Sequence, residues 1–230
     1  MVDTSQGGLR AAVSPESTTS GGWPGWGPLS GIAFVVFFVA TSFMSGTPSA
    51  NDSNASWTAW FASAAHRDVL TATGFTGLVA ALALLSFIVN IWTRVAVVSG
   101  ARVTNPLPVA AAAVAAAAIA SGALLQAVIP GAMVFNSMPE PSPGIIRVLE
   151  NVAGPLVFVG GMIALALAVA SLALQARAAG AFGKRLTIFS LVVAVLTVFS
   201  FEFFPVLAPL VWVVTVSIIL IRRPALIRTA

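Results

Sequence analysis

Long apolar stretches separated by short polar connections occupy most of the chain after residue 28. A helix needs about 20 apolar residues to cross about 30 Å of hydrocarbon. The stretches are long enough for this, and the last is long enough to cross twice. We therefore predict an all-α polytopic membrane protein folded as a six-transmembrane-helix bundle. The expected spans are about 29–46, 69–93, 107–134, 149–176, 186–203 and 206–221.

The last apolar stretch, from Leu186 to Ile221, carries a single charged residue, Glu202. A single helix over this stretch would be roughly 54 Å long, well beyond one crossing. A charge is costly at the centre of a bilayer and much less costly at its edge. Pro205 prevents a helix from continuing through this point. We therefore predict a tight turn at Glu202–Pro205, between the fifth and sixth spans.

The two ends of the chain differ from this pattern. Residues 1–27 are rich in Ser, Thr, Gly and Pro, a composition typical of a disordered tail. Residues 224–230 form a second short tail, so the membrane domain is expected to cover residues 28–223. The first apolar stretch has no convincing cleavage site after it, and we expect it to be kept as a helix rather than removed as a signal peptide.

Charge is scarce and sorts by side. The chain of 230 residues is 58% hydrophobic and 8% charged, whereas soluble domains are about 25% charged. With alternating spans, one side receives nine of the eleven Lys and Arg residues, and the other receives only Arg67 and Arg147. Positive residues favour the cytoplasm, so we expect a bacterial plasma membrane protein with both termini cytoplasmic. The net charge of +4 forms no basic stripe and does not indicate nucleic acid binding.

Several kinds of chemistry are excluded by composition. The chain has no cysteine, which removes disulfides, thiol catalysis, iron–sulfur clusters and cysteine zinc sites. His66 is the single histidine. No nucleotide-binding loop or dinucleotide fingerprint is present. We therefore predict no metal site, no cofactor and no catalytic residue.

The third span is rich in alanine, and its small side chains allow close helix packing. We expect it at the centre of the bundle. Gln126 and the Pro130–Gly131 pair interrupt its outer half. Two interpretations stay open: a kink with one interhelical hydrogen bond, or a broken helix lining a substrate cavity.

Polar residues expected on the outer side form the candidate binding site. Asp68 is placed to cap or begin the second span, and the i, i+3 spacing of Arg147 and Glu150 favours an ion pair. The cluster could be a salt-bridged rim, a ligand or proton site, or a catalytic centre. Its members are His66, Arg67, Asp68, Gln126, Arg147, Glu150, Asn151 and Glu202.

The segment SWTAWFASAAHRD places Trp57, Trp60 and Phe61 on one face of a short helix. An aromatic face of this kind suits a helix lying in the outer headgroup region, and the alternative is a loop that gates a cavity. Trp212 falls inside the sixth span, where we expect it to pack.

Three segments carry a resemblance to a known group. They are MSGTPSAND after the first span, WTAWFASAAHRD before the second, and LVWVVTVSIILIRR at the end of the last. Across most of residues 29–223 the chain resembles a family of actinobacterial six-helix integral membrane proteins whose function is unknown. The resemblance implies the architecture and the membrane location, and it implies no activity, cofactor or catalytic residue.

The sequence favours a non-enzymatic membrane protein, either a component that handles a small molecule or lipid, or an assembly partner. The alternative is a small secondary transporter or channel, and a membrane-embedded enzyme is less favoured. The expected partners are the lipid bilayer and either other membrane subunits or further copies of the chain.

Overall fold

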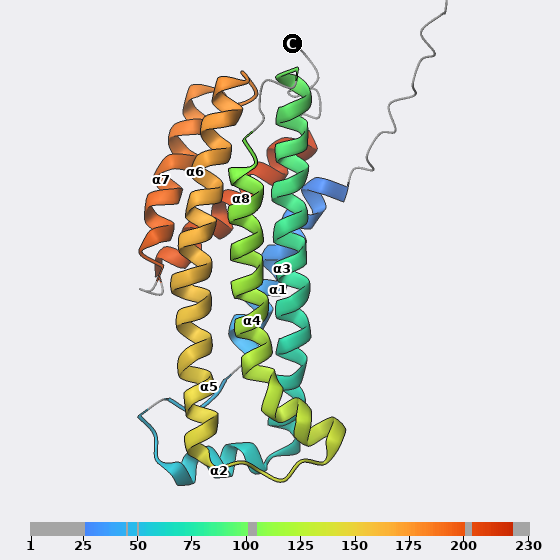
Figure 1. Cartoon of the computed structure of the whole chain (residues 1–230), viewed down its shortest axis with the longest axis vertical. Helices are drawn as coiled ribbons and strands as arrows, with labels where there is room; N and C mark the ends of the chain where they lie inside the picture. Colours follow the sequence, from blue (N-terminus) through green and yellow to red (C-terminus); the bar gives the residue numbers. More distant parts are fainter. Residues whose placement is uncertain (1–25, 45, 50, 101–104, 201–203, 223–230) are drawn as a thin grey trace, which may run out of the picture.

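The structure is a computed structural model of the chain, and it describes residues 26–44, 46–49, 51–100, 105–200 and 204–222. All regular secondary structure within these ranges is helical, as predicted. Figure 1 shows an elongated bundle whose long helices run along its vertical axis. The predicted tails lie outside the described residues, except that Trp26 and Gly27 already belong to the first helix.

Four helical segments are long and apolar enough to cross a membrane. They are α1 (Trp26–Met44), α3 (Ala64–Val98), α4 (Leu107–Asn136) and the continuous segment Pro143–Ala178. The structure therefore confirms an α-helical membrane-type protein. The helices α3 and Pro143–Ala178 extend beyond the predicted spans at both ends, because a helix can continue past the apolar stretch that crosses lipid.

The segment Pro143–Ala178 is not a uniform α-helix. It consists of α5 (Pro143–Pro155), a π-helical segment η1 (Leu156–Gly161) and α6 (Met162–Ala178). Pro155 cannot donate a backbone hydrogen bond, and π-helical turns often occur where a helix carries a functional site. The irregular turns begin directly after Pro155 and end at Gly161.

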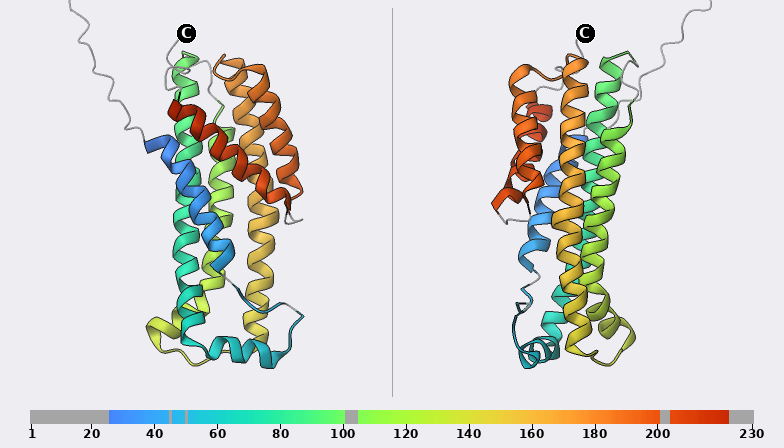
Figure 2. Two further views of the ribbon diagram at one scale, coloured as in Figure 1. Left: turned by 180° about the vertical axis from the view of Figure 1, so that it is seen from behind. Right: turned by 60° about the vertical axis from the view of Figure 1, so that its left-hand side comes forward.

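The last apolar stretch forms a short hairpin. α7 (Lys184–Val198) and α8 (Leu207–Arg222) contain 15 and 16 residues, and the short 3-10 helix η2 (Phe204–Val206) precedes α8. α7 is three residues shorter than the predicted span 186–203, whereas α8 has the same length as the predicted span 206–221 and is shifted by one residue. The chain reverses between them, and this reversal lies only partway along the bundle (Figures 1 and 2). Glu202 lies outside the described residues.

The alanine-rich helix α4 lies at the centre of the bundle, between α3 and α6, as predicted. α3 and α4 approach closely through small side chains. A Cβ atom added at Gly77 would lie 2.2 Å from the Cβ of Ala123, so only glycine fits there. The buried faces are therefore set by small-residue packing, which is the usual basis of helix association in lipid.

Trp212 packs inside the bundle, as predicted. Its side chain is fully buried on α8, and its Nε1 donates a hydrogen bond of 2.8 Å to Ser190 Oγ on α7. Its ring meets Phe87 edge-on, with ring centroids 6.0 Å apart. This contact ties the α7–α8 hairpin to α3.

The segment SWTAWFASAAHRD forms the end of one helix and the start of the next. α2 (Asn54–Ala62) ends at Ser63, whose extended backbone separates it from α3. Trp57 and Phe61 are buried against Leu70, Ile129 and Ile146. The expectation of an aromatic face lying in the headgroup region is therefore wrong for these two side chains, which form a second small core at this end of the bundle.

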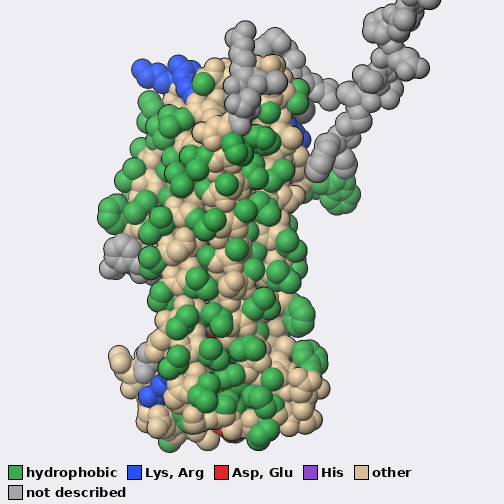
Figure 3. Space-filling model, viewed as in Figure 1, with side chains coloured by type: hydrophobic (Ala, Val, Ile, Leu, Met, Phe, Trp, Pro, Cys, Tyr) green, Lys and Arg blue, Asp and Glu red, His purple; other side chains and the backbone are tan. Residues whose placement is uncertain are grey.

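Charged residues divide between the two ends of the bundle. Arg94, Arg177, Lys184, Arg185 and Arg222 lie toward the end that carries the α6–α7 connection. Arg67 and Arg147 lie toward the end that carries α2, together with the described Asp and Glu residues. Figure 3 shows a flank covered by hydrophobic side chains, with Lys and Arg near its two ends.

Candidate functional site

One face of α5 and η1 changes from charged to apolar along its length. Arg147, Glu150, Gly154 and Phe158 follow one another at spacings of three or four residues, so they share one side of the helix. Opposite this side lies the second half of α1, followed by residues 46–49. The space between the two contains two cavities that have no lining residue in common, and we call them together the α1–α5 groove.

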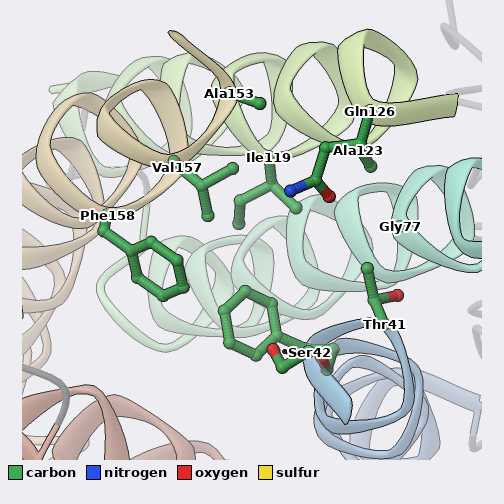
Figure 4. A pocket seen from close by; sticks show the side chains of 11 residues that line it. Thr41, Ser42, Gly77, Ile119, Ala123, Gln126, Ala153, Val157 and Phe158 are labelled. Atoms are coloured by element: carbon green, nitrogen blue, oxygen red, sulfur yellow. Dashed lines mark hydrogen bonds between the residues drawn. The ribbon is translucent and has the colours of Figure 1, made fainter. Parts of the chain in front are cut away.

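The apolar cavity of the groove has a volume of about 270 Å³. Figure 4 shows the side chains of Ile119, Val157 and Phe158 around it, with Thr41 and Ser42 on the α1 side. The hydroxyl groups of Thr41 and Ser42 donate hydrogen bonds to the carbonyls of Phe37 and Phe38. These hydroxyls are therefore already paired, and the cavity offers a mainly apolar lining.

The polar cavity of the groove has a volume of about 190 Å³. It is lined by Thr47, Pro48, Trp57, Arg147, Glu150 and Asn151. Arg147 Nη2 donates a hydrogen bond to the backbone carbonyl of Asp52, and its guanidinium carbon lies 5.9 Å from the centre of the Trp57 ring. These contacts hold the positive charge of Arg147 at the cavity wall.

A hydrogen bond connects a residue that lines the apolar cavity with a residue that lines the polar cavity. Gln126 on α4 donates from Nε2 to Glu150 Oε2 on α5 at 3.1 Å. Gln126 also lines the apolar cavity, and Glu150 also lines the polar one. Four residues after Gln126, Pro130 lies inside α4, which bends toward its end in Figure 1. The interpretation of a kink with one interhelical hydrogen bond is therefore confirmed.

The predicted ion pair between Arg147 and Glu150 is wrong. Across the described ranges these two side chains form no ion pair, because Arg147 turns to the backbone of Asp52 and Glu150 turns to Gln126. Asn151 is exposed and lines the polar cavity. Gln126, Arg147, Glu150 and Asn151 are therefore brought together, as a site with a guanidinium and a carboxyl group that are not paired with each other.

The other predicted residues do not line the groove. His66 stacks on Trp60 with ring centroids 4.6 Å apart, and its Nδ1 lies 3.0 Å from the Trp60 carbonyl oxygen. Arg67 donates hydrogen bonds to the carbonyls of Phe61 and Ala62, which satisfies the end of α2. Both residues therefore fasten the corner between α2 and α3.

Asp68 does not cap α3. The cap position belongs to Ser63, and Asp68 lies exposed beyond the first turn. Glu202, the last predicted member of the site, falls outside the residues that the structure describes. Within the described ranges no group of three His, Asp or Glu side chains is arranged to hold a metal ion.

Sequence reasoning missed the α1 wall of the groove, formed by Phe38, Thr41 and Ser42. It also missed Val157 and Phe158 on η1. The spacing of Arg147, Glu150, Gly154 and Phe158 was a usable signal for the opposite wall. No comparable signal exists on α1, where nearly all residues are apolar.

Comparison of the chain with protein families, with curated proteins and with solved structures finds no match. The resemblance to the actinobacterial family stays a prediction. Function is therefore inferred from the geometry of the groove.

Proposed function

We propose that the protein crosses the bacterial plasma membrane six times and has both termini in the cytoplasm. Four helical segments are long enough to cross alone, and the α7–α8 hairpin would supply two further, shorter crossings. The excess of Lys and Arg at one end of the bundle supports the orientation, since positive residues favour the cytoplasmic side. The α2 end then faces outward.

We further propose that the protein is a non-enzymatic component that holds a lipid-like molecule in the α1–α5 groove. The observation that carries this proposal is the single face of α5 and η1, which lines a polar cavity at one end and an apolar cavity at the other. An amphiphile has the same division along its length. Binding sites are typically apolar pockets with a few well-placed polar groups.

The packing of the helices supports entry from the bilayer. α1 packs mainly on α3 and α8, whereas α5 and η1 pack mainly on α4. The two walls of the groove therefore belong to different parts of the bundle. The α7–α8 hairpin does not extend along the bundle as far as α2 (Figure 2). A lipid chain could enter between the walls without any helix leaving its place.

The groove favours binding over conduction. A transporter or channel needs a polar path through the membrane, and the polar residues toward the cytoplasmic half include Asn90 and Gln175. Neither lines the groove. The lining of the apolar cavity includes Phe38, Val157 and Phe158, which supports holding an apolar chain.

A leucine at Gly154 tests the proposal. Gly154 lines the apolar cavity, and a Cβ atom added there meets no other atom within 4 Å, so the new side chain would occupy the groove without a clash at its base. We expect Gly154→Leu to reduce lipid retained by the full-length protein after gentle purification, by about tenfold if the chain loses a contact of about 1.4 kcal/mol. Lipids are measured by native mass spectrometry.

Gly160→Leu is the matched control. Gly160 lies on the adjoining π-helical segment, has the same free space around its Cβ position, and does not line the groove. Equal lipid retention in Gly154→Leu, Gly160→Leu and the unmodified protein would show that the groove holds no lipid.

A further inference from the structure

The polar cavity presents a guanidinium and a carboxyl group to the same small volume. Arg147 and Glu150 both line it, and they are not paired with each other. Arg147 has five N–H donors and places one nitrogen on a backbone carbonyl, and its Nε has no partner among the described residues. Glu150 receives one hydrogen bond, from Gln126.

A guanidinium and a carboxyl group at one cavity favour a zwitterionic lipid headgroup, which contains one positive and one negative group. A phosphate matches the guanidinium of Arg147, which binds phosphate through several N–H groups. The carboxylate of Glu150 accepts hydrogen bonds and attracts a cation. An anionic headgroup without a cation would place its negative charge beside Glu150. A headgroup without a phosphate would leave Arg147 without a counter-charge.

The hydrogen-bonding groups of the polar cavity indicate which kind of ammonium group the headgroup carries. A primary ammonium has three N–H donors, so it can bind Glu150 directly and still donate to Asn151, which is exposed at the same cavity. A trimethylated ammonium has no donor. Trp57, which also lines the cavity, already stacks against Arg147 and is not free to form an aromatic cage for a methylated cation.

We propose that the α1–α5 groove selects a phospholipid whose headgroup contains a phosphate and a primary ammonium. The phosphate lies at Arg147, the ammonium lies at Glu150 and Asn151, and one acyl chain enters the apolar cavity past Gly154. The inference rests on the proposed lipid-holding function and adds the class of headgroup.

The test compares three phospholipids that share the same acyl chains and differ in headgroup: ethanolamine, choline and glycerol. The full-length protein is purified and titrated with each lipid, and the bound fraction is measured by native mass spectrometry. We expect the ethanolamine lipid to bind about tenfold more tightly than the other two, as one additional charge-assisted hydrogen bond would give.

Glu150→Gln tests the role of the carboxyl group. A glutamine oxygen can still accept the hydrogen bond from Gln126, so the contact between α4 and α5 is kept while the charge is lost. We expect this variant to bind the ethanolamine and choline lipids equally. Glu140→Gln is the matched control, because Glu140 is exposed and lines neither cavity. It should keep the preference.

The results distinguish a failure of the headgroup preference from a failure of lipid binding in the groove. Lipid binding that falls in Gly154→Leu but shows no preference among the three headgroups would overturn the headgroup inference and leave the groove as a lipid site. An ethanolamine preference that persists in Glu150→Gln would also overturn it. Binding that Gly154→Leu leaves unchanged would overturn the proposed function itself.

Discussion

At the scale of single residues, small side chains decide where the helices meet. Gly77 on α3 faces Ala123 on α4, and Gly122 on α4 faces Val157 on η1. An added Cβ atom would lie 2.2 Å from the Ala123 Cβ in the first case and 2.3 Å from a Val157 methyl in the second. These contacts fix the distance from α4 to α3 and to η1, and therefore the position of both cavities.

Gly77→Ala is expected to destabilise the fold. The new methyl group cannot fit unless α3 and α4 move apart, which should cost about 1–3 kcal/mol, as overpacking usually does. The measurement is the thermal unfolding midpoint in detergent, followed by tryptophan fluorescence. Gly160→Ala is the control, because its Cβ would lie in open space. Equal midpoints for the two variants would show that α3 and α4 are not in close contact here.

The sequence correctly predicted the positions of small, aromatic and amide side chains within the bundle. The alanine-rich helix is central, Trp212 packs inside, and Gln126 makes one interhelical hydrogen bond. The partners of charged side chains were not predicted. The i, i+3 spacing of Arg147 and Glu150 allows an ion pair, but tertiary contacts to Asp52 and Gln126 compete with it and prevail.

At the scale of elements, α2 is held by its aromatic residues. Trp57 and Phe61 are buried, the two rings lie 6.4 Å apart, and Trp57 Nε1 donates to the Ser49 carbonyl at 3.3 Å. Trp57 also contacts Arg147 and lines the polar cavity. α2 therefore both closes this end of the bundle and helps to position a charge of the site.

Trp57→Ala should release α2 from the bundle. Removing a buried aromatic side chain typically costs about 3–5 kcal/mol, and this local core is small enough that α2 should detach while the long helices stay packed. Limited proteolysis of the purified protein should then cut between residues 46 and 63 faster than in the unmodified protein. Trp26→Ala, at a side chain that is 70% exposed, should leave the cutting rate unchanged.

Rapid cutting in both tryptophan variants would point to a general loss of stability. No change in Trp57→Ala would show that α2 is fastened by other contacts, such as those of Arg67 to the Phe61 and Ala62 carbonyls.

The sequence predicts where the helices lie along the chain more reliably than which side of each helix contacts a neighbouring helix. The apolar stretches predicted helices, because each must satisfy its own backbone hydrogen bonds in lipid. They did not predict which side of each helix faces a neighbour, since lipid and protein interior are both apolar. For this reason the face of Trp57 and Phe61 was assigned to the membrane, and the α1 wall of the groove at Phe38, Thr41 and Ser42 gave no signal.

At the scale of the whole molecule, the arrangement of spans can be tested through cysteines, because the native chain contains none. We expect Asp68→Cys and Leu207→Cys to react with a membrane-impermeant maleimide in intact cells. Ala178→Cys should react only after permeabilisation. All three side chains are exposed and lie at helix ends on the expected sides. Labelling is read from the mass of the purified protein.

Leu207→Cys is the decisive position of the three. It lies just after the reversal between α7 and α8, and its reaction from outside would require the hairpin to cross the membrane. Protection of Leu207→Cys with labelling of Asp68→Cys would favour four spans and a hairpin that stays on the cytoplasmic side. Labelling of Ala178→Cys in intact cells would reverse the orientation.

The short hairpin also gives the protein a perimeter of unequal height. α3 has 35 residues and a length of roughly 52 Å, whereas α7 with 15 residues is roughly 22 Å long. Hydrocarbon about 30 Å thick exceeds the shorter helix, and such hydrophobic mismatch is relieved when neighbouring lipids thin the bilayer locally. If α7 and α8 cross the membrane as proposed, the membrane beside them should be thinner than the membrane beside α3, and bilayers of shorter acyl chains should accommodate the protein at lower elastic cost.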